Sequence, residues 1–182
     1  MVLGRIGKVD REGGFSLLEL LAAIVLLGIL LTLGAFALKN FWMRRSLDGS
    51  TKQVTAQLRQ MQQRAVAESH PLIYGAGFTE GSPTYTLLKY DPAATSSKCE
   101  TLTTVPLEDG VKVAAATSFA SSPYITLSEC DPAAGDQFVF FFARGTATGG
   151  TLKLTHEGLV GTSQDTTTIK VTNLTGRVEG GY

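Results

Sequence analysis

The feature that most constrains this chain is an apolar run near its N-terminus. Of the 24 residues from Phe15 to Leu38, 19 are apolar and one, Glu19, is charged. As a helix this run would extend about 36 Å, enough to cross a bilayer core of about 30 Å. Two other interpretations compete with a membrane span. One is a secretory signal cleaved near Ala35-Phe36-Ala37, although such apolar regions are usually only about 7–15 residues long; the other is a buried core helix. A purely cytosolic protein is not expected.

Charge is divided unevenly along the chain. The 182 residues hold 16 basic and 16 acidic side chains. Residues 39–64 carry six basic and one acidic side chain, a net charge of +5, whereas residues 65–182 carry seven basic and twelve acidic ones, a net charge of −5. With 43% hydrophobic residues, the composition excludes a disordered chain. We expect one domain with an appendage, in which a basic stem precedes an acidic head.

The helical pattern continues beyond the apolar run. Residues 39–69 contain no proline, and Pro71 is expected to end the helix. Apolar side chains recur with a helical period at Leu47, Val54, Leu58, Met61 and Ala65. The sequence therefore predicts one helix over residues 15–69, about 80 Å long. The alternative is two helices with a break near Asp48-Gly49-Ser50.

From Pro71 onward the periodicity changes to that of short strands separated by Gly, Pro, Ser and Asp clusters. The predicted strands are 71–78, 84–90, 111–114, 124–127, 137–143, 151–155 and 168–172. Phe138–Phe142 is apolar on both faces, which predicts a central strand or one packed against the helix. Gly145 and Gly176 are expected at hairpin turns with positive φ. The predicted fold class is α+β: a long N-terminal helix packed on a C-terminal antiparallel β-sheet head.

The residues around Glu19 resemble a known processing signal. Gly13-Gly14-Phe15-Ser16-Leu17-Leu18-Glu19 follows a short charged leader and opens the apolar run. It resembles the class III signal of type IV pilins and type II secretion pseudopilins. The resemblance implies that a prepilin peptidase cuts after Gly14 and methylates Phe15, and that Glu19 is the glutamate used in assembly. Phe36 stands where many major pilins have a proline, which favours a minor component.

The C-terminal sequence extends this resemblance over most of the chain. Phe140–Gly145, Thr151–Leu154 and Thr175–Val178 look like the GspH/FimT domain of minor pseudopilins and minor pilins. The resemblance divides the chain into a leader peptide at 1–14, a transmembrane and assembly half-helix at 15–38, an amphipathic half-helix at 39–70 and an extracytoplasmic β-rich head at 71–182.

The resemblance implies a structural role without catalysis. The chain would be a minor pseudopilin or minor type IV pilin at or near the tip of a filament for type II protein secretion or pilus biogenesis. Its partners would be other pilins or pseudopilins, the prepilin peptidase and the inner-membrane assembly platform. It would cross the bacterial inner membrane once, with its N-terminus cytoplasmic and its head periplasmic, and then enter a periplasmic or surface filament. Neither a metal nor a cofactor is expected, because no zinc, phosphate-loop or nucleophile motif is present.

Cys99 and Cys130 are the only cysteines. If the head lies outside the cytoplasm, a disulfide between them is expected, closing a loop of about 30 residues. Two reduced, buried thiols are the alternative.

Two other functions stay open. Some minor pilins of this domain type resemble DNA-uptake receptors, and Arg144, Lys153, Lys170 and Arg177 could form a basic patch if their strands adjoin. The net charge of −5 on the head disfavours DNA as a partner. The other function is that of a monomeric, membrane-tethered periplasmic binding module.

Overall fold

The structure is a computed structural model with two compact units, Met1–Lys39 and Asn40–Tyr182. It describes residues 16–68, 71–95, 97–115, 117–121, 125, 130, 136–159, 161 and 165–181, without the side chains of 33, 36 and 37. The predicted leader at 1–14, the cleavage site Gly14/Phe15 and most of the predicted strand at 124–127 lie outside the described residues.

One helix, α1 (Leu17–Glu68), contributes to both units. It begins after Ser16, whose side-chain oxygen accepts a hydrogen bond from the Leu18 backbone N–H at 3.3 Å. A serine in this position satisfies one of the free N–H groups of the first turn. The helix ends before Pro71, as predicted.

The helix is continuous through Gly49, so the alternative of a break there is wrong. Gly49 has a packing role instead: a side-chain carbon at this position would lie 2.3 Å from a carboxylate oxygen of Glu108. The Glu108 backbone N–H also donates to the Ser50 hydroxyl at 2.9 Å. Glycine therefore leaves room for the Glu108 carboxylate beside the helix, at a cost of about 1 kcal/mol relative to alanine in a helix interior.

The first unit consists of the apolar part of α1. Its described large apolar side chains are all exposed, from 53% at Ile29 to 84% at Leu17. Among the described residues, which leave out Phe15 and the side chains of residues 33, 36 and 37, no helix has the length and apolar character needed to cross a membrane.

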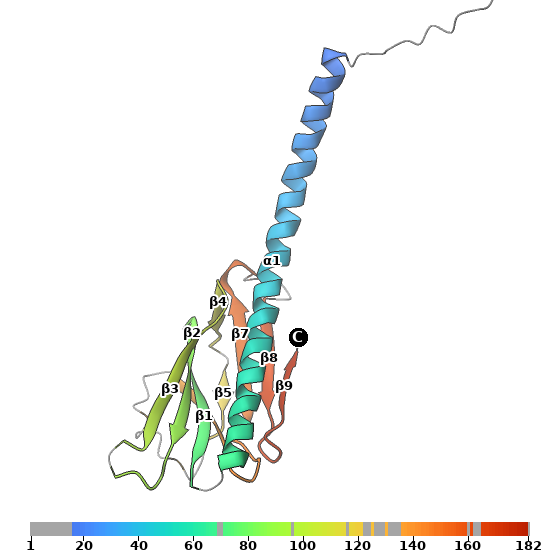
Figure 1. Ribbon diagram of the computed structural model, residues 1–182. Helices are drawn as coiled ribbons and strands as arrows, with labels where there is room; N and C mark the ends of the chain where they lie inside the picture. Colours follow the sequence, from blue (N-terminus) through green and yellow to red (C-terminus); the bar gives the residue numbers. More distant parts are fainter. Residues whose placement is uncertain are drawn as a thin grey trace, which may run out of the picture. The chain divides into compact units, whose positions relative to one another are not determined.

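The second unit packs the remainder of α1 against two antiparallel sheets (Figure 1). One sheet has the order β3-β2-β1-β6 and the other β4-β7-β8-β9, with β5 paired to β7. The strands are β1 (Ile73–Thr79), β2 (Thr84–Tyr90), β3 (Cys99–Pro106), β4 (Val111–Val113), β5 (Ser118–Phe119), β6 (Asp136–Phe141), β7 (Gly150–His156), β8 (Thr166–Val171) and β9 (Val178–Gly181). A short 3-10 helix, Glu157–Leu159, follows β7. The predicted α+β fold with an antiparallel head is confirmed.

The main core lies between α1 and both sheets. The predicted apolar stripe of the helix is confirmed, because Leu47, Val54, Leu58, Met61 and Ala65 are all buried. They share one cluster with inward-facing side chains of seven strands, β1, β2, β4 and β6 to β9, among them Leu152, Leu154 and Ile169. Both sheets are thus held together through a single helix face.

A second, smaller core lies on the other face of the first sheet. It contains Leu88, Tyr90, Phe138 and Phe140, together with Ile125 from the segment before Cys130. Its position explains why Phe138–Phe142 is apolar on both faces: Val139 and Phe141 belong to the main core. The prediction that this strand contacts the helix core is confirmed, but β6 is the last strand in its sheet's order and not a central one.

Candidate assembly site

Glu19 lies in the first turn of α1 and is exposed. A carboxylate at this position interacts favourably with the positive end of the helix dipole. Within the described part of the chain Glu19 makes no ion pair. Its predicted partner, an amine at Phe15, lies outside the described residues. Four positions separate the two in the sequence.

The helix surface that follows Glu19 is almost entirely apolar. Exposed leucine, isoleucine and valine side chains extend from Leu17 to Leu31. Contiguous exposed apolar surface of this extent is typical of a region that binds lipid or other apolar protein surface. The described part of the first unit thus combines one carboxylate with exposed apolar side chains.

The structure brings two of the four predicted basic residues of the head onto one sheet face. Lys153 of β7 and Lys170 of β8 are both on the face opposite the helix, because Leu152, Leu154 and Ile169 occupy the buried positions. Lys170 pairs in register with Glu179 of β9. This carboxylate lies beside the lysine and lowers the positive charge of the face.

The other two residues, Arg144 and Arg177, flank two loops that touch. The backbone of Gly145 meets that of Gly176, where an added side-chain carbon would lie 2.3 Å from the Gly145 carbonyl oxygen. Both glycines have positive φ, 79° and 59°, as predicted. Arg177 forms an ion pair with Glu179 at 2.8 Å, so its charge is already partnered.

A glutamine on α1 holds these loops, and sequence reasoning missed it. The Gln62 side-chain amide donates to the carbonyl oxygens of Gly145, at 3.2 Å, and Thr175, at 3.1 Å. One turn earlier, the Arg59 guanidinium donates to the Val178 carbonyl oxygen at 3.0 Å. Polar side chains on a helix are usually solvated, and nothing in the sequence distinguishes Gln62 from Gln60 or Gln63.

Cys99 and Cys130 form a disulfide, with their Cα atoms 5.0 Å apart. The predicted pairing is confirmed, and the alternative of two reduced thiols is wrong. The disulfide joins β3 to the segment whose Ile125 packs on the outer face of the first sheet. The disulfide therefore holds the segment that contains Ile125 and Cys130 against the smaller core.

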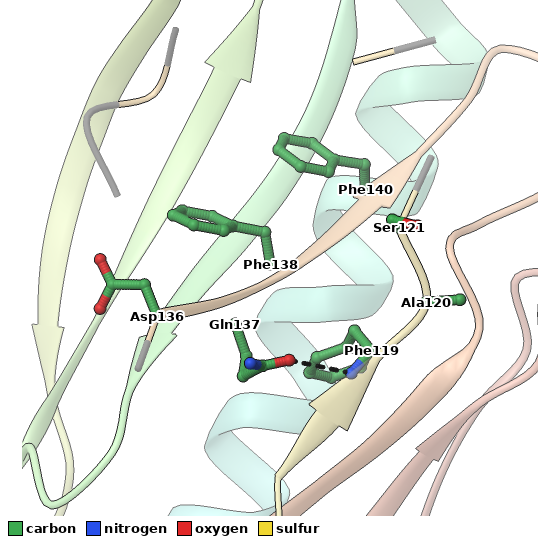
Figure 2. Close-up of a pocket in the computed structure, with 7 residues that line it drawn as sticks. All are labelled: Phe119, Ala120, Ser121, Asp136, Gln137, Phe138 and Phe140. Atoms are coloured by element: carbon green, nitrogen blue, oxygen red, sulfur yellow. Dashed lines mark hydrogen bonds between the residues drawn. The ribbon is translucent and has the colours of Figure 1, made fainter. Parts of the chain in front are cut away.

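The described part of the head contains a cavity between strands β5 and β6. The cavity has a volume of about 220 Å³, and Figure 2 shows the Phe119 N–H donating to the Gln137 side-chain oxygen at 3.3 Å within it. Its lining residues are Phe119, Ala120, Ser121, Asp136, Gln137, Phe138 and Phe140. Within the described ranges no three His, Cys, Asp or Glu side chains are grouped as metal ligands.

The N-terminal sequence matches a known family model. Residues 10–35 match the prokaryotic N-terminal methylation motif. The predicted class III prepilin signal around Gly14 and Glu19 is thereby confirmed. The match includes the exposed carboxylate and most of the apolar surface described above.

Two solved structures are similar to this chain. The minor pseudopilin EpsH from the Type 2 Secretion System of Vibrio cholerae is 12% identical, with a TM-score of 0.49, over 74% of this chain and 95% of its own. The type IV minor pilin FimU of Pseudomonas aeruginosa (strain PAO1) is 13% identical, with a TM-score of 0.48, over 78% of this chain and 92% of its own. No match was found among curated protein sequences.

Proposed function

We propose that this chain is a minor pilin or pseudopilin, a structural subunit that is processed at its methylation motif and assembled through its N-terminal helix into a filament for secretion or pilus biogenesis. The observation that carries the proposal is the match of residues 10–35 to the methylation motif, together with the exposed apolar side chains of the described helical residues in it. A prepilin peptidase would cut between Gly14 and Phe15. Before assembly, the apolar residues 15–38 would anchor the chain in the inner membrane, with the head in the periplasm.

Glu19 gives this assembly its register. A carboxylate in an apolar environment is costly unless it is paired, and the amine created at Phe15 is the nearest cation that processing supplies. Pairing with the amine of a neighbouring subunit would favour the assembled state and fix the axial offset between two helices. Because Glu19 would pair with the N-terminal amine of a further subunit, this proposal places another subunit above this chain and does not place the chain at the extreme tip. The partners are therefore other pilins or pseudopilins and the inner-membrane assembly platform.

The direct test replaces Glu19 by valine in the native host. We expect Glu19→Val to be inserted and cleaved normally but to be depleted from the sheared filament fraction. Asp48→Val, which removes a carboxylate from the same helix whose ion pair with Lys52 is exposed and contributes little, is the control and should assemble normally. Normal incorporation of Glu19→Val would show that the carboxylate has no role in assembly. A chain that stays monomeric in crosslinking experiments would favour a tethered binding module instead.

DNA binding is a second candidate because the loops that carry Arg144 and Arg177 touch. The Arg177–Glu179 ion pair and the register pairing of Lys170 with Glu179 weigh against it. Phosphate binding needs uncompensated clustered cations.

A further inference from the structure

Two large aromatic side chains are exposed on α1 immediately after the apolar residues. Phe41 and Trp42 are 56% and 57% exposed, and their ring centroids are 6.2 Å apart in an edge-on arrangement. The Arg45 guanidinium carbon lies 5.9 Å from the centre of the Trp42 ring. Arg44 and Arg45 are exposed as well. These four residues are referred to below as the aromatic–arginine collar.

The opposite side of the same helical turn is buried in the second unit. Met43 is 9% exposed, and its sulfur lies against the backbone of Gly158. Leu47, one turn later, is fully buried in the main core. The head thus takes up one side of this turn and leaves the collar uncovered on the other. A partner from outside the described residues must cover it if the aromatic surface is to leave water.

The chemistry of the collar fits the interfacial layer of a phospholipid bilayer. Tryptophan combines a large apolar ring with one N–H donor, so it is enriched where hydrocarbon meets water. Arginine presents several donors in a planar arrangement that matches phosphate oxygens. Its aliphatic part can lie along apolar surface while the guanidinium remains hydrated.

The spacing along the chain agrees with this depth. About 20 helical residues cross the hydrocarbon core, and the headgroup layer on each side adds about 5–7 Å, or about three to five residues. Because the Glu19 carboxylate is costly in hydrocarbon, the count starts at Leu20, and a span would then leave the hydrocarbon near residue 39. The next residues, which include Phe41, Trp42 and Arg44, would then lie in the headgroup layer.

We propose that the aromatic–arginine collar binds the phosphate and glycerol layer of the membrane in which the chain is anchored. Trp42 and Phe41 insert beside the upper acyl chains, and Arg44 and Arg45 contact lipid phosphates. This inference rests on the membrane-anchored stage of the proposed function.

The test uses Trp42 as a probe, because it is the only tryptophan of the chain. The full chain is reconstituted into phosphatidylcholine vesicles whose acyl chains are brominated either near the headgroup or near the chain end. We expect blue-shifted Trp42 emission that shallow bromines quench more strongly than deep ones. Two relocated probes calibrate depth. Trp42→Phe with Leu26→Trp should be quenched best by deep bromines. Trp42→Phe with Gln60→Trp should be quenched by aqueous acrylamide only.

The possible outcomes distinguish a failure of lipid binding by the aromatic–arginine collar from a failure of the proposed membrane anchoring. If the chain floats with vesicles after alkaline washing but Trp42 is quenched only by acrylamide, the collar does not bind lipid, and a protein partner would have to cover it. If deep bromines quench Trp42 best, the headgroup placement is wrong. If the chain does not float at all, the membrane-anchored stage of the proposed function fails together with the inference.

Discussion

Two tyrosines of the main core differ in how their hydroxyl groups are satisfied. The Tyr74 hydroxyl donates to the Glu68 carboxylate at the end of α1. The Tyr85 hydroxyl is buried and has no hydrogen-bond partner among the described residues. The Tyr85 ring stacks on Phe78, with centroids 5.6 Å apart, so the packing of the ring does not need the oxygen.

We therefore predict opposite effects for two chemically identical substitutions. Tyr85→Phe should raise the free energy of unfolding of the 40–182 fragment by about 1 kcal/mol, because it removes an unsatisfied buried group. Tyr74→Phe should lower it by about 1–2 kcal/mol, since it removes a hydrogen bond to a charged acceptor. Urea unfolding of the two variants beside the parent chain measures both. Destabilisation by Tyr85→Phe would mean that its hydroxyl is satisfied after all.

Tyr74 and Tyr85 also predict that the folded head becomes less stable at alkaline pH. Burial raises the pKa of Tyr85 to about 12, and burial together with the hydrogen bond to Glu68 raises the pKa of Tyr74 to about 12. In the unfolded chain both would ionise near pH 10, so above that pH the unfolded state binds fewer protons than the folded state. The free energy of unfolding should fall between about pH 10 and pH 12. In a Tyr74→Phe/Tyr85→Phe variant this fall should be smaller; an unchanged fall would contradict the assignment.

At the scale of elements, the disulfide is the feature with the largest expected effect on stability. It joins Cys99 of β3 to Cys130, which packs against the smaller core, and closes a loop with a sequence separation of 31. In the chain-entropy model such a loop is worth about 3–4 kcal/mol. The Cys99→Ser/Cys130→Ser variant should lose about that much in the free energy of unfolding, measured by urea titration of the 40–182 fragment.

Reduction provides the control for this prediction. Dithiothreitol should destabilise the parent fragment by a similar amount and leave the double variant unchanged. Two thiols that alkylate readily in periplasmic material would show that the disulfide does not form in the native compartment.

How far the sequence predicts an element depends on whether the element buries a regular pattern. The stripe from Leu47 to Ala65 is buried as its period predicts, and β2 occupies the predicted residues 84–90. The strands β3, β5 and β9 were missed. Nearly all of β3 is exposed, so no apolar alternation marks it; β5 has only two residues, and β9 is Val-Glu-Gly-Gly. These strands form because their neighbours offer hydrogen-bonding edges, which is tertiary information.

Some residues of the candidate site can likewise be predicted from the sequence, and others cannot. Gly14, Phe15 and Glu19 form a motif with fixed spacing, which is readable from one sequence, and the family match covers it. Gln62 depends on two loops that lie 83 and 113 residues further along the chain. The weakness of the basic patch could not be predicted either, since it depends on the pairing of Lys170 and Arg177 with Glu179.

For the whole molecule, charge predicts poor binding of nucleic acid. Residues 40–64 contribute +4 and residues 65–182 contribute −5, so the 40–182 fragment has a net charge of −1, and Arg177 is already ion-paired. The fragment should therefore bind duplex DNA weakly or undetectably at physiological salt. Fluorescence anisotropy over a salt series measures this. Submicromolar affinity with a steep salt dependence, abolished by Arg177→Ala but not by Gln60→Ala, would instead support the DNA-uptake alternative.

The central claim is that this chain is a processed filament subunit, and its mature N-terminus tests that most directly. Cleavage after Gly14 would leave 182 − 14 = 168 residues beginning with Phe15. Mass spectrometry of the N-terminal peptide, from protein isolated from its native host, should find N-methylated Phe15. A mature chain that begins at Leu38 would show that residues 1–37 are removed as an ordinary secretory signal, and would contradict both the anchoring and the assembly proposed for α1.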